Sequence, residues 1–257
     1  KSQFYFKIYG KWFLNKLKQI DYFFVQDNNS KELLNLNNID NVSITGDTRI
    51  DRVKEIARED KKFDSIEKFI NNDLCFIAGS SWEADNVIFL NSILKKSNLK
   101  TIIAPHNIVE SEIKTLEKKS QSLSVRYSRI DQDLNNNKKI LIIDSVGSLK
   151  HLYKFSDIAY IGGAMGNSGL HNILEAAVFG IPIVIGKNYK GFSEAKDLVK
   201  LGGVKSINSE IEFKDIFNNL TSNKTVREKM GKINKDYIYS NSGGSKKIIK
   251  ALKKSLV

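Results

Sequence analysis

The residues best suited to binding chemistry lie in residues 157–186. An apolar run, a glycine-rich loop, an amphipathic segment and a second apolar run follow one another there. Such a strand, loop and helix can hold an anion, because small residues let the backbone approach the ligand and a helix N-terminus favours negative charge. Gly162, Gly163 and Gly169 are the turn residues that permit this approach. The segment therefore predicts a site for a phosphorylated or nucleotide ligand.

Asn172 and Glu175 stand at the start of the helix that we expect over residues 171–180. Their Asn-x-x-Glu spacing is that of a capping box, which stabilises a helix without any ligand. The same side chains are also placed to bind a ligand, with Glu175 accepting hydrogen bonds from ribose hydroxyls. The spacing alone favours the capping box, and the two roles can coexist. We expect His171 to be structural, held in the turn.

Further loops add to this site, because the carboxyl ends of parallel strands share one edge of a sheet and ligands bind at that edge. The candidate loops contain Gly79, Ser80 and Trp82, then Pro105 and His106, then Val146, Gly147 and Ser148, and last Gly186 and Lys187. We expect Trp82 to pack against its neighbours rather than to stack on a base. Taken alone, His106 is interpreted as a satisfied loop histidine.

Short apolar runs alternate with helical segments through most of the chain. Strands are expected at residues 22–27, 41–45, 74–80, 99–106, 138–145, 157–163, 181–186 and 203–207. Continuous apolar runs indicate a parallel sheet with helices on both faces. The predicted fold class is α/β, with one complete doubly wound, Rossmann-like domain over residues 54–238 that begins with a charged helix over 54–72. Residues 1–53 are expected to be the tail of a second α/β domain, and residues 239–257 a basic C-terminal helix.

The composition restricts the function classes. The chain has 257 residues, of which 41% are hydrophobic and 27% charged, as in ordinary α/β proteins. Cys75 is the single cysteine and lies in an apolar run, so we expect a buried, non-nucleophilic thiol and a reducing compartment. No apolar run approaches the roughly 20 residues of a membrane span. The histidines at 106, 151 and 171 lack ligand spacing, so no metal site is expected.

The net charge of +12 admits a solvated lysine-rich surface, a nucleic-acid partner or an anionic membrane. Residues 246–254 form one concentrated basic patch, without the aromatic signature of an RNA-binding module, so no specific nucleic-acid binding is expected. The first segment suits an amphipathic helix with Phe6, Trp12, Phe13 and Leu17 on its apolar side. Packing within its own domain is favoured there over binding at a membrane surface.

Five motifs occur in order along almost the whole chain: GDTRIDR, AGSSWEAD, IIAPH, IGGAMGNSGLHNILEAAVFGIPIVIG and GFSEA. Together they resemble the 3-deoxy-D-manno-octulosonic acid (Kdo) transferase family. The resemblance implies the two-domain GT-B glycosyltransferase fold, with residues 1–53 as the end of the acceptor-side domain and 54–238 as the nucleotide-sugar domain. It also implies transfer of Kdo from CMP-Kdo to a lipid A precursor during lipopolysaccharide biosynthesis. The expected location is the cytoplasmic face of the bacterial inner membrane, peripheral or anchored through an N-terminal segment that precedes this chain.

The resemblance also implies roles for individual residues. The positions that match CMP-binding residues are Pro105, His106, Val146, Gly147, Ser148, Asn172, Ile173, Leu174 and Glu175, supported by the loop residues Gly79, Ser80, Gly162, Gly163 and Gly169. His106 replaces the arginine that is common in the family, and histidine is a weaker phosphate partner. Arg49 matches a residue that stabilises the transition state, although it could simply pair with Asp47 or Asp51.

The family's general base is a glutamate early in the first domain, and nothing in this chain matches it. We therefore name no base, and we expect the chain alone to bind CMP weakly and to transfer no sugar. No metal or other cofactor is implied. Two alternatives remain open: another GT-B enzyme, such as a nucleotide-sugar epimerase or a UDP-sugar glycosyltransferase, and a non-catalytic module that binds anions or lipids.

Overall fold

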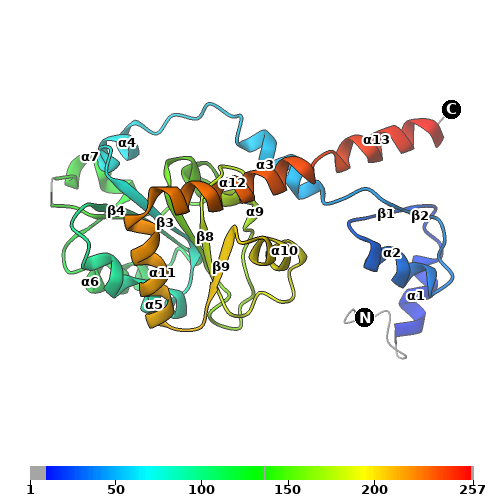
Figure 1. Ribbon diagram of the computed structural model, residues 1–257, viewed down its shortest axis with the longest axis horizontal. Coiled ribbons are helices and arrows are strands. Elements are labelled where there is room, and N and C mark those ends of the chain that lie inside the picture. The colour runs from blue at the N-terminus through cyan, green and yellow to red at the C-terminus, as the bar shows by residue number, and fades with distance from the viewer. Residues whose placement is uncertain (1–9, 136, 256–257) are drawn as a thin grey trace. The chain divides into compact units, whose positions relative to one another are not determined.

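The computed structural model describes residues 10–135 and 137–255, so the expected apolar position Phe6 lies outside the described residues. The chain divides into two compact units (Figure 1). The smaller unit combines Lys1–Arg52 with Tyr239–Val257, and the larger unit is Val53–Ile238.

The smaller unit contains a short β-α-β arrangement. Helix α1 (Lys11–Leu17) comes first, and strands β1 (Phe23–Val25) and β2 (Val42–Ile44) pair in parallel around helix α2 (Asn28–Asn35). The Asp27 side chain caps α2 by accepting a hydrogen bond from the Ser30 amide at 2.7 Å. A small cluster of Leu34, Ile39 and Val42 forms the core.

Helix α13 (Gly244–Ser255) belongs to the same unit and is held at its start by Asp51 of helix α3 (Thr48–Ile56). The two carboxylate oxygens of Asp51 accept from the amides of Gly243 at 2.6 Å and Ser245 at 2.7 Å. An acidic group at a helix N-terminus satisfies amides that the helix leaves unpaired and complements the helix dipole. The motif GDTRIDR thus contributes a cap for the basic C-terminal helix.

The larger unit is built on a parallel sheet of seven strands in the order β5-β6-β4-β3-β7-β8-β9. The strands are β3 (Leu74–Ser81), β4 (Leu99–Pro105), β5 (Ser124–Arg126), β6 (Ile140–Ile142), β7 (Ile158–Ile161), β8 (Ile183–Gly186) and β9 (Val204–Ile207). Most of their side chains are buried on both faces, because helices cover the sheet. This confirms the predicted doubly wound α/β fold. The short edge strand β5 was not among the expected strands.

Helices connect the strands. They are α4 (Asp64–Ile70), α5 (Glu83–Leu94), α6 (Glu110–Lys119), α7 (Ile130–Asp133), α8 (Leu149–Leu152), α9 (Leu174–Ala177), α10 (Ser193–Leu201), α11 (Glu210–Ser222) and α12 (Lys224–Ser240), with 3-10 turns at Tyr127–Arg129 and Tyr153–Phe155. Helices α5 and α11 pack together beside β3 (Figure 1). An aromatic cluster fills this layer, with the Phe76 ring centroid 5.8 Å from that of Phe89 and 5.3 Å from that of Phe217.

Two expected helices differ from the structure. The single helix predicted over residues 54–72 is the end of α3 and the separate α4, because Phe63 turns into the core between them and contacts the rings of His151 and Phe155. The helix predicted over residues 171–180 shortens to the four residues of α9. A helix of one turn has little dipole, so the anion site expected from its N-terminus loses part of its physical basis.

The strand order places a topological switch point between β3 and β7. The chain runs from β3 outward to β4, β5 and β6, then returns to β7 on the other side of β3. Loops that leave neighbouring strands in opposite directions open a crevice at the carboxyl edge, where ligands of such folds bind. The predicted site loops follow β3, β4, β6 and β7 and therefore share this edge.

Candidate functional site

At the switch point, the end of β3 and the loop that follows β7 are in direct backbone contact. A Cβ atom on Gly162 would lie 2.3 Å from the Ser80 carbonyl oxygen, so only glycine fits there. Ser80 itself adopts a left-handed φ of +51°, which bends the chain at the end of β3. The Gly162 amide donates to the Gly79 carbonyl at 2.9 Å. The supporting glycines thus join the two loops rather than line an open cradle.

Asp85 ties the same two loops together from the first turn of α5. Its fully buried carboxylate accepts hydrogen bonds from the Trp82 amide at 2.9 Å, the Gly163 amide at 2.9 Å and the Tyr160 hydroxyl at 2.8 Å. Burial and the charge of Asp85 raise the pKa of Tyr160 far above its ordinary value. The amides of Gly162 and Gly163 therefore already have protein partners. Neither amide is therefore free to bind an anion.

Asn172 and Glu175 contact each other, but in a different way from a capping box. The Asn172 side-chain oxygen accepts from the Leu174 amide at 3.2 Å, and its amide nitrogen donates to Glu175 Oε1 at 3.3 Å. This is a tight local turn two residues long, whereas a capping box reaches the third helical residue. Both side chains remain partly exposed, while Ile173 and Leu174 are buried. Ile173 and Leu174 are thus part of the packed turn and expose no surface to a ligand.

Glu175 also lies close to the end of β3. Burial and the nearby charge of Glu175 raise the pKa of Tyr153 well above its ordinary value. The Tyr153 hydroxyl fills the space beside Gly79, where a Cβ atom would lie only 1.8 Å from it. The structure thus brings both Gly79 and Glu175 close to Tyr153.

Trp82, His106 and His171 form an aromatic cluster at the carboxyl ends of β3, β4 and β7. The Trp82 and His106 rings stack at 4.3 Å between centroids, and the His106 and His171 centroids are 4.5 Å apart. The Trp82 indole donates to His171 Nε2 at 3.4 Å, which places the His171 proton on Nδ1. Burial lowers the pKa of His171, and the charge of His106 lowers it further. Trp82 is therefore packed against side chains, as expected.

Beyond this cluster, the loops after β4 and β6 are open. His106 is exposed, and the Val146 side chain is 90% exposed. Gly147 has a φ of +93°, and a Cβ atom there would meet no described atom within 4 Å. Pro105 and Ser148 are half-buried at the base of these loops. The predicted positions after β4 and β6 thus offer accessible main chain and side chains on the same edge.

Gly169 belongs to the loop that leaves β7 and leads to α9. Its φ is +89°, and its carbonyl oxygen would lie 2.1 Å from a Cβ atom on Gly163. The Asn188 amide and side chain donate to the carbonyls of Ala164 at 2.9 Å and Gly166 at 2.7 Å, which links this loop to the one after β8. The loop is thus shaped by close main-chain contacts, as its glycines predict.

Arg49 belongs to the smaller unit, whereas the other predicted site residues belong to the larger unit. Its guanidinium pairs with the Asp47 carboxylate, with Nη2 to Oδ2 at 2.7 Å and Nε to Oδ2 at 2.9 Å. Of the two pairings considered from the sequence, the one with Asp47 forms, while Asp51 caps α13. The side chain of Arg49 remains 43% exposed, so the pair fixes its orientation without burying it.

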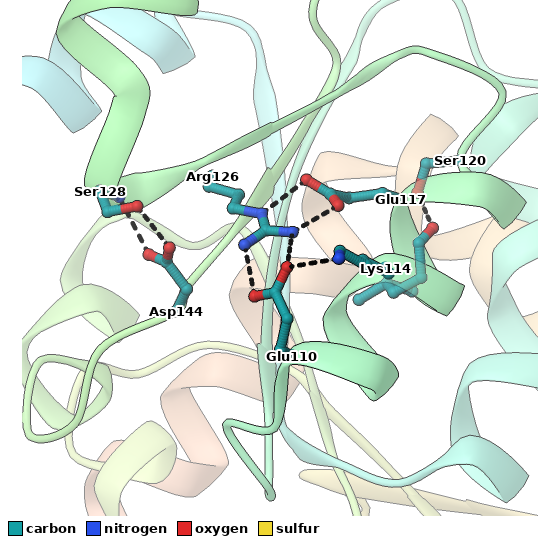
Figure 2. Close-up of polar contacts among 8 residues, drawn as sticks. Glu110, Lys114, Glu117, Ser120, Arg126, Ser128 and Asp144 are labelled. Atoms are coloured by element: carbon teal, nitrogen blue, oxygen red, sulfur yellow. Dashed lines mark hydrogen bonds and ion pairs between the residues drawn. The ribbon is translucent and has the colours of Figure 1, made fainter.

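Sequence reasoning missed a charged clamp at the β5 edge of the sheet. Figure 2 shows the Arg126 guanidinium between the carboxylates of Glu110 and Glu117, with the nearest contacts at 2.8 and 2.7 Å. These hydrogen bonds lower the pKa of both glutamates and raise that of Arg126. Beside it, the Ser128 amide donates to Asp144 at 2.9 Å (Figure 2). The available signal was the Glu110–Glu117 spacing of seven, which places both carboxylates on one helix face.

Three further expectations concern the single cysteine, metal binding and membrane-spanning helices. Cys75 is fully buried, and burial raises its thiol pKa, so it is inert as expected. Within residues 10–135 and 137–255, no three histidine, cysteine, aspartate or glutamate side chains are grouped closely enough to hold a metal ion. In the same ranges, no helix combines the length and the apolar character that crossing a bilayer requires.

Comparisons with known proteins find both sequence relatives and solved structures with a similar fold. The 3-deoxy-D-manno-octulosonic acid transferase of Haemophilus influenzae is 30% identical over 222 residues, which cover 82% of this chain and 51% of that protein. The chain thus spans about half the length of this curated relative. The C-terminal CMP-Kdo binding domain of WaaA from Acinetobacter baumannii has a similar fold, with a TM-score of 0.55 and 20% identity over 74% of this chain and 97% of that domain.

A UDP-N-acetylglucosamine 2-epimerase shares the fold as well, with a TM-score of 0.60 and 14% identity over 82% of this chain and 52% of that protein. No family model matches the chain. Fold similarity at this level of identity is common to many GT-B proteins, whereas the sequence match is to the transferases. The chain is therefore similar in sequence to Kdo transferases, and its larger unit has the α/β fold of a GT-B glycosyltransferase domain.

Proposed function

We propose that this chain is the donor-binding part of a glycosyltransferase that moves Kdo from CMP-Kdo to a lipid A precursor in lipopolysaccharide biosynthesis. The observation that carries the proposal is the 30% identity with a Kdo transferase over 82% of the chain. The open loops around His106 and Gly147 support it, because they leave accessible groups at the edge where nucleotides bind in such folds.

Each loop has a distinct part in the proposed CMP site. We assign nucleotide contacts to Pro105, His106, Val146, Gly147, Ser148, Asn172 and Glu175, while the buried Ile173 and Leu174 form the turn that carries Asn172 and Glu175. Glu175 is partly exposed and accepts hydrogen bonds from the ribose hydroxyls, while Asn172 orients its carboxylate through the 3.3 Å contact. The open space at Gly147 lets the nucleotide approach the main chain. His106 contacts the phosphate and carries a positive charge only when protonated.

In the proposed reaction, an acceptor hydroxyl forms a bond to the anomeric carbon of Kdo as the bond from that carbon to the CMP phosphate oxygen breaks. Negative charge develops on the departing phosphate. We propose that Arg49, oriented by Asp47, stabilises this charge. The chain offers no assigned general base, and the proposal invokes neither a metal nor another cofactor. Replacing Arg49 with alanine in the intact enzyme is expected to lower kcat for Kdo transfer with little change in KM.

We propose, in addition, that helix α13 binds an anionic membrane surface, which places the enzyme peripherally at the cytoplasmic face of the inner membrane. The helix carries Lys246, Lys247, Lys250 and Lys253, together with Ile249 and Leu252, which are 53% and 47% exposed. A basic helix with exposed apolar side chains suits binding at the interface of anionic lipids. Asp51 holds the start of the helix, so its orientation within the smaller unit is fixed.

The membrane proposal is tested by sedimentation with lipid vesicles. Vesicles with anionic lipid are expected to retain the protein at low salt, and vesicles of zwitterionic lipid are not. Replacing Lys246, Lys250 and Lys253 with glutamine should release it. A matched triple change in α12, Lys224, Lys229 and Lys232 to glutamine, removes the same charge elsewhere. Equal release by both variants would mean that net charge, rather than α13, carries the binding.

The nucleotide proposal is tested by calorimetric titration with a panel of nucleotides. CMP is expected to bind more tightly than UMP or UDP, because the resemblance is to enzymes that use a CMP-linked donor. The Glu175→Gln variant should weaken CMP binding by about 10-fold to 100-fold, since hydrogen bonds to a charged group contribute roughly 1.5–3 kcal/mol.

Glu228→Gln is the matched control, because Glu228 is an exposed carboxylate on α12 of the same unit. It should leave CMP binding unchanged. Selectivity for UDP, with the same loss on changing Glu175, would replace this proposal with a UDP-sugar enzyme. Binding without nucleotide preference that disappears with salt would instead indicate a general anion-binding module.

A further inference from the structure

Trp82 covers one face of His106, the residue that we assign to the phosphate, at the carboxyl ends of β3 and β4. The two rings are nearly parallel, with 22° between their planes and 4.3 Å between their centroids. Trp82 is half-buried, whereas His106 is exposed. An exposed imidazole would otherwise turn freely, so the indole limits the directions in which its ring nitrogens can point.

An irregularity at the end of β3 brings Trp82 beside His106. Ser80 is an extra residue in the pairing of β3 with β4, and its φ of +51° is left-handed. A bulge of this kind changes the direction of the side chains that follow it. In addition, the His106 amide donates to the Ser81 carbonyl at 2.9 Å. His106 is therefore held twice, at its main chain by Ser81 and at its ring by Trp82.

The Trp82 side chain is itself fixed by two further groups. Its indole N–H donates to His171 Nε2 at 3.4 Å, and its main-chain amide donates to the Asp85 carboxylate at 2.9 Å. Burial and the charge of His106 lower the pKa of His171, whereas the charge of Asp85 raises it. Because burial has the largest effect, His171 is neutral at neutral pH and remains an acceptor for the indole. A ring that is fixed in this way can orient the ring stacked on it.

A histidine at a phosphate depends on its orientation more than an arginine does. The guanidinium of arginine offers several N–H donors in a planar fork, whereas an imidazole offers only its ring nitrogens. The imidazole of His106 can therefore reach a phosphate oxygen in few ring orientations. Ordering a free side chain on binding costs affinity, and a ring that is oriented beforehand avoids this cost.

We propose that Trp82 is a positioning residue for His106, whose ring it orients so that an imidazole nitrogen meets the phosphate of the nucleotide donor. The inference rests on the proposed role of His106 in the CMP site. Because Trp82 acts through His106, it affects the affinity for the phosphate group and not the affinity for the nucleoside.

Titration calorimetry with CMP and with cytidine tests this distinction, because cytidine has the base and ribose of CMP without its phosphate. Trp82→Leu is expected to weaken CMP binding about threefold to tenfold, as for one side chain that is no longer ordered, and to leave cytidine binding unchanged. Trp82→Phe keeps an aromatic face and should restore most of the CMP affinity. Trp12→Leu is the matched control, because Trp12 is exposed and belongs to the smaller unit. It should change neither affinity.

A double-mutant cycle shows whether Trp82 acts through His106. His106→Ala should weaken the binding of CMP and leave that of cytidine unchanged. In the His106→Ala background, Trp82→Leu should have no further effect on CMP binding, because the side chain that it orients is absent. If Trp82→Leu does not fold, Trp82→Met takes its place in both experiments, since the flexible methionine side chain fills irregular gaps.

Proton NMR tests the stack without a ligand. The chain has three histidines, so His106→Ala assigns one of three Hε1 resonances. The indole ring current should shift the His106 resonance upfield, and Trp82→Leu should return it towards the value of a free imidazole. His151 is the internal control, because its ring packs against Phe63 instead. The His151 resonance should not move.

The outcomes separate this inference from the nucleotide proposal. No CMP binding by the unchanged chain would overturn the nucleotide proposal and, with it, the role of Trp82. CMP binding that Trp82→Leu leaves unchanged, or weakens as much as cytidine binding, would overturn the inference alone. So would a full effect of Trp82→Leu in the His106→Ala background, or a His106 resonance that does not depend on Trp82.

Discussion

The carboxyl edge of the large sheet has a closed half and an open half. In the closed half, after β3 and β7, the Gly162 amide bonds to the neighbouring loop, and Asp85 accepts three hydrogen bonds. In the open half, after β4 and β6, His106 and Val146 are exposed, and Gly147 has open space beside it. The closed half fixes the relative position of the strands' loops, and the open half leaves main chain and side chains for a ligand.

The difference has a physical cause. Buried polar groups destabilise a fold unless they are hydrogen-bonded, so the interior loops at the switch point must satisfy one another. Groups that remain exposed bond to water and can exchange that water for a ligand. A glycine therefore has a different role in each half. Gly162 permits contact between two backbones, whereas Gly147 leaves space that a ligand can occupy.

The largest effect is expected from Asp85→Ala. The change leaves the amides of Trp82 and Gly163 and the hydroxyl of Tyr160 without their acceptor in a buried site. We expect a loss on the order of 4 kcal/mol in the free energy of unfolding, since each buried unsatisfied group costs roughly 1–3 kcal/mol and the three are coupled. Urea unfolding followed by tryptophan fluorescence measures it. A loss below about 1 kcal/mol would show that Asp85 does not hold the closed half together.

A pair of glycine variants tests the two halves directly. Gly162→Ala places a Cβ atom 2.3 Å from the Ser80 carbonyl oxygen, so the backbones must separate at a cost of about 2–3 kcal/mol. In Gly147→Ala the added Cβ atom meets no described atom within 4 Å. The cost is then the backbone strain of a side chain at a φ of +93°, about 1 kcal/mol. Urea unfolding of both variants gives the comparison. Equal losses would mean that the two loops are equally packed.

Much of this edge could be predicted from the sequence. Apolar runs such as residues 74–80 identify the strands, and a parallel sheet brings their carboxyl ends together, so the loops at Gly79, His106 and Gly147 were placed on one edge correctly. The glycines after β7 also signal a tight turn. What the sequence does not show is which partner each group takes. Asp85 stands four residues beyond the strand in an ordinary helical segment, and its three donors come from positions 82, 160 and 163.

The lengths of helix α9 and strand β5 could not be predicted from the sequence either. The pattern over residues 171–180 is periodic enough for a helix, but α9 has four residues, because Asn172 satisfies the Leu174 amide locally and Gly180 has a φ of +70°. Strand β5 has three residues and lacks an apolar run, so its pairing with β6 and the Arg126 clamp depend on tertiary contacts. Local patterns do not encode such contacts.

A smaller effect is expected from Arg126→Met. In the unchanged protein, Arg126 lies at the edge of the sheet next to the open half. Methionine keeps most of the apolar stem but loses the contacts with Glu110 and Glu117. We expect Tm to fall by about 3 °C at pH 7, as for a partly exposed charge network in a domain of this size. Because Arg126 lowers the pKa of both glutamates, its contribution is present above their unfolded pKa of about 4.3 and is lost as pH falls through the lower folded values.

The Tm difference between Arg126→Met and the unchanged protein should therefore shrink below about pH 4. Lys114→Met is a suitable control, because Lys114 pairs with Glu110 at 3.5 Å and both side chains are mostly exposed. Its effect on Tm should be much smaller. A Tm difference that stays constant between pH 7 and pH 3 would show that Arg126 stabilises the edge through packing rather than through charge.

The smallest effect is expected from His171→Gln, at the boundary between the two halves. Burial lowers the folded pKa of His171, so the unfolded chain takes up a proton first, at its pKa of about 6.5, and stability falls as pH drops through that value. A proton on Nε2 would also face the Trp82 indole N–H, which now donates to that atom. Glutamine can accept the same hydrogen bond without titrating. Between pH 7 and pH 5, Tm should fall by about 1–2 °C less in the variant than in the unchanged protein. His151, whose pKa burial also lowers, leaves a residual slope in both. If the two slopes are equal, the boundary between the halves does not depend on the charge of His171.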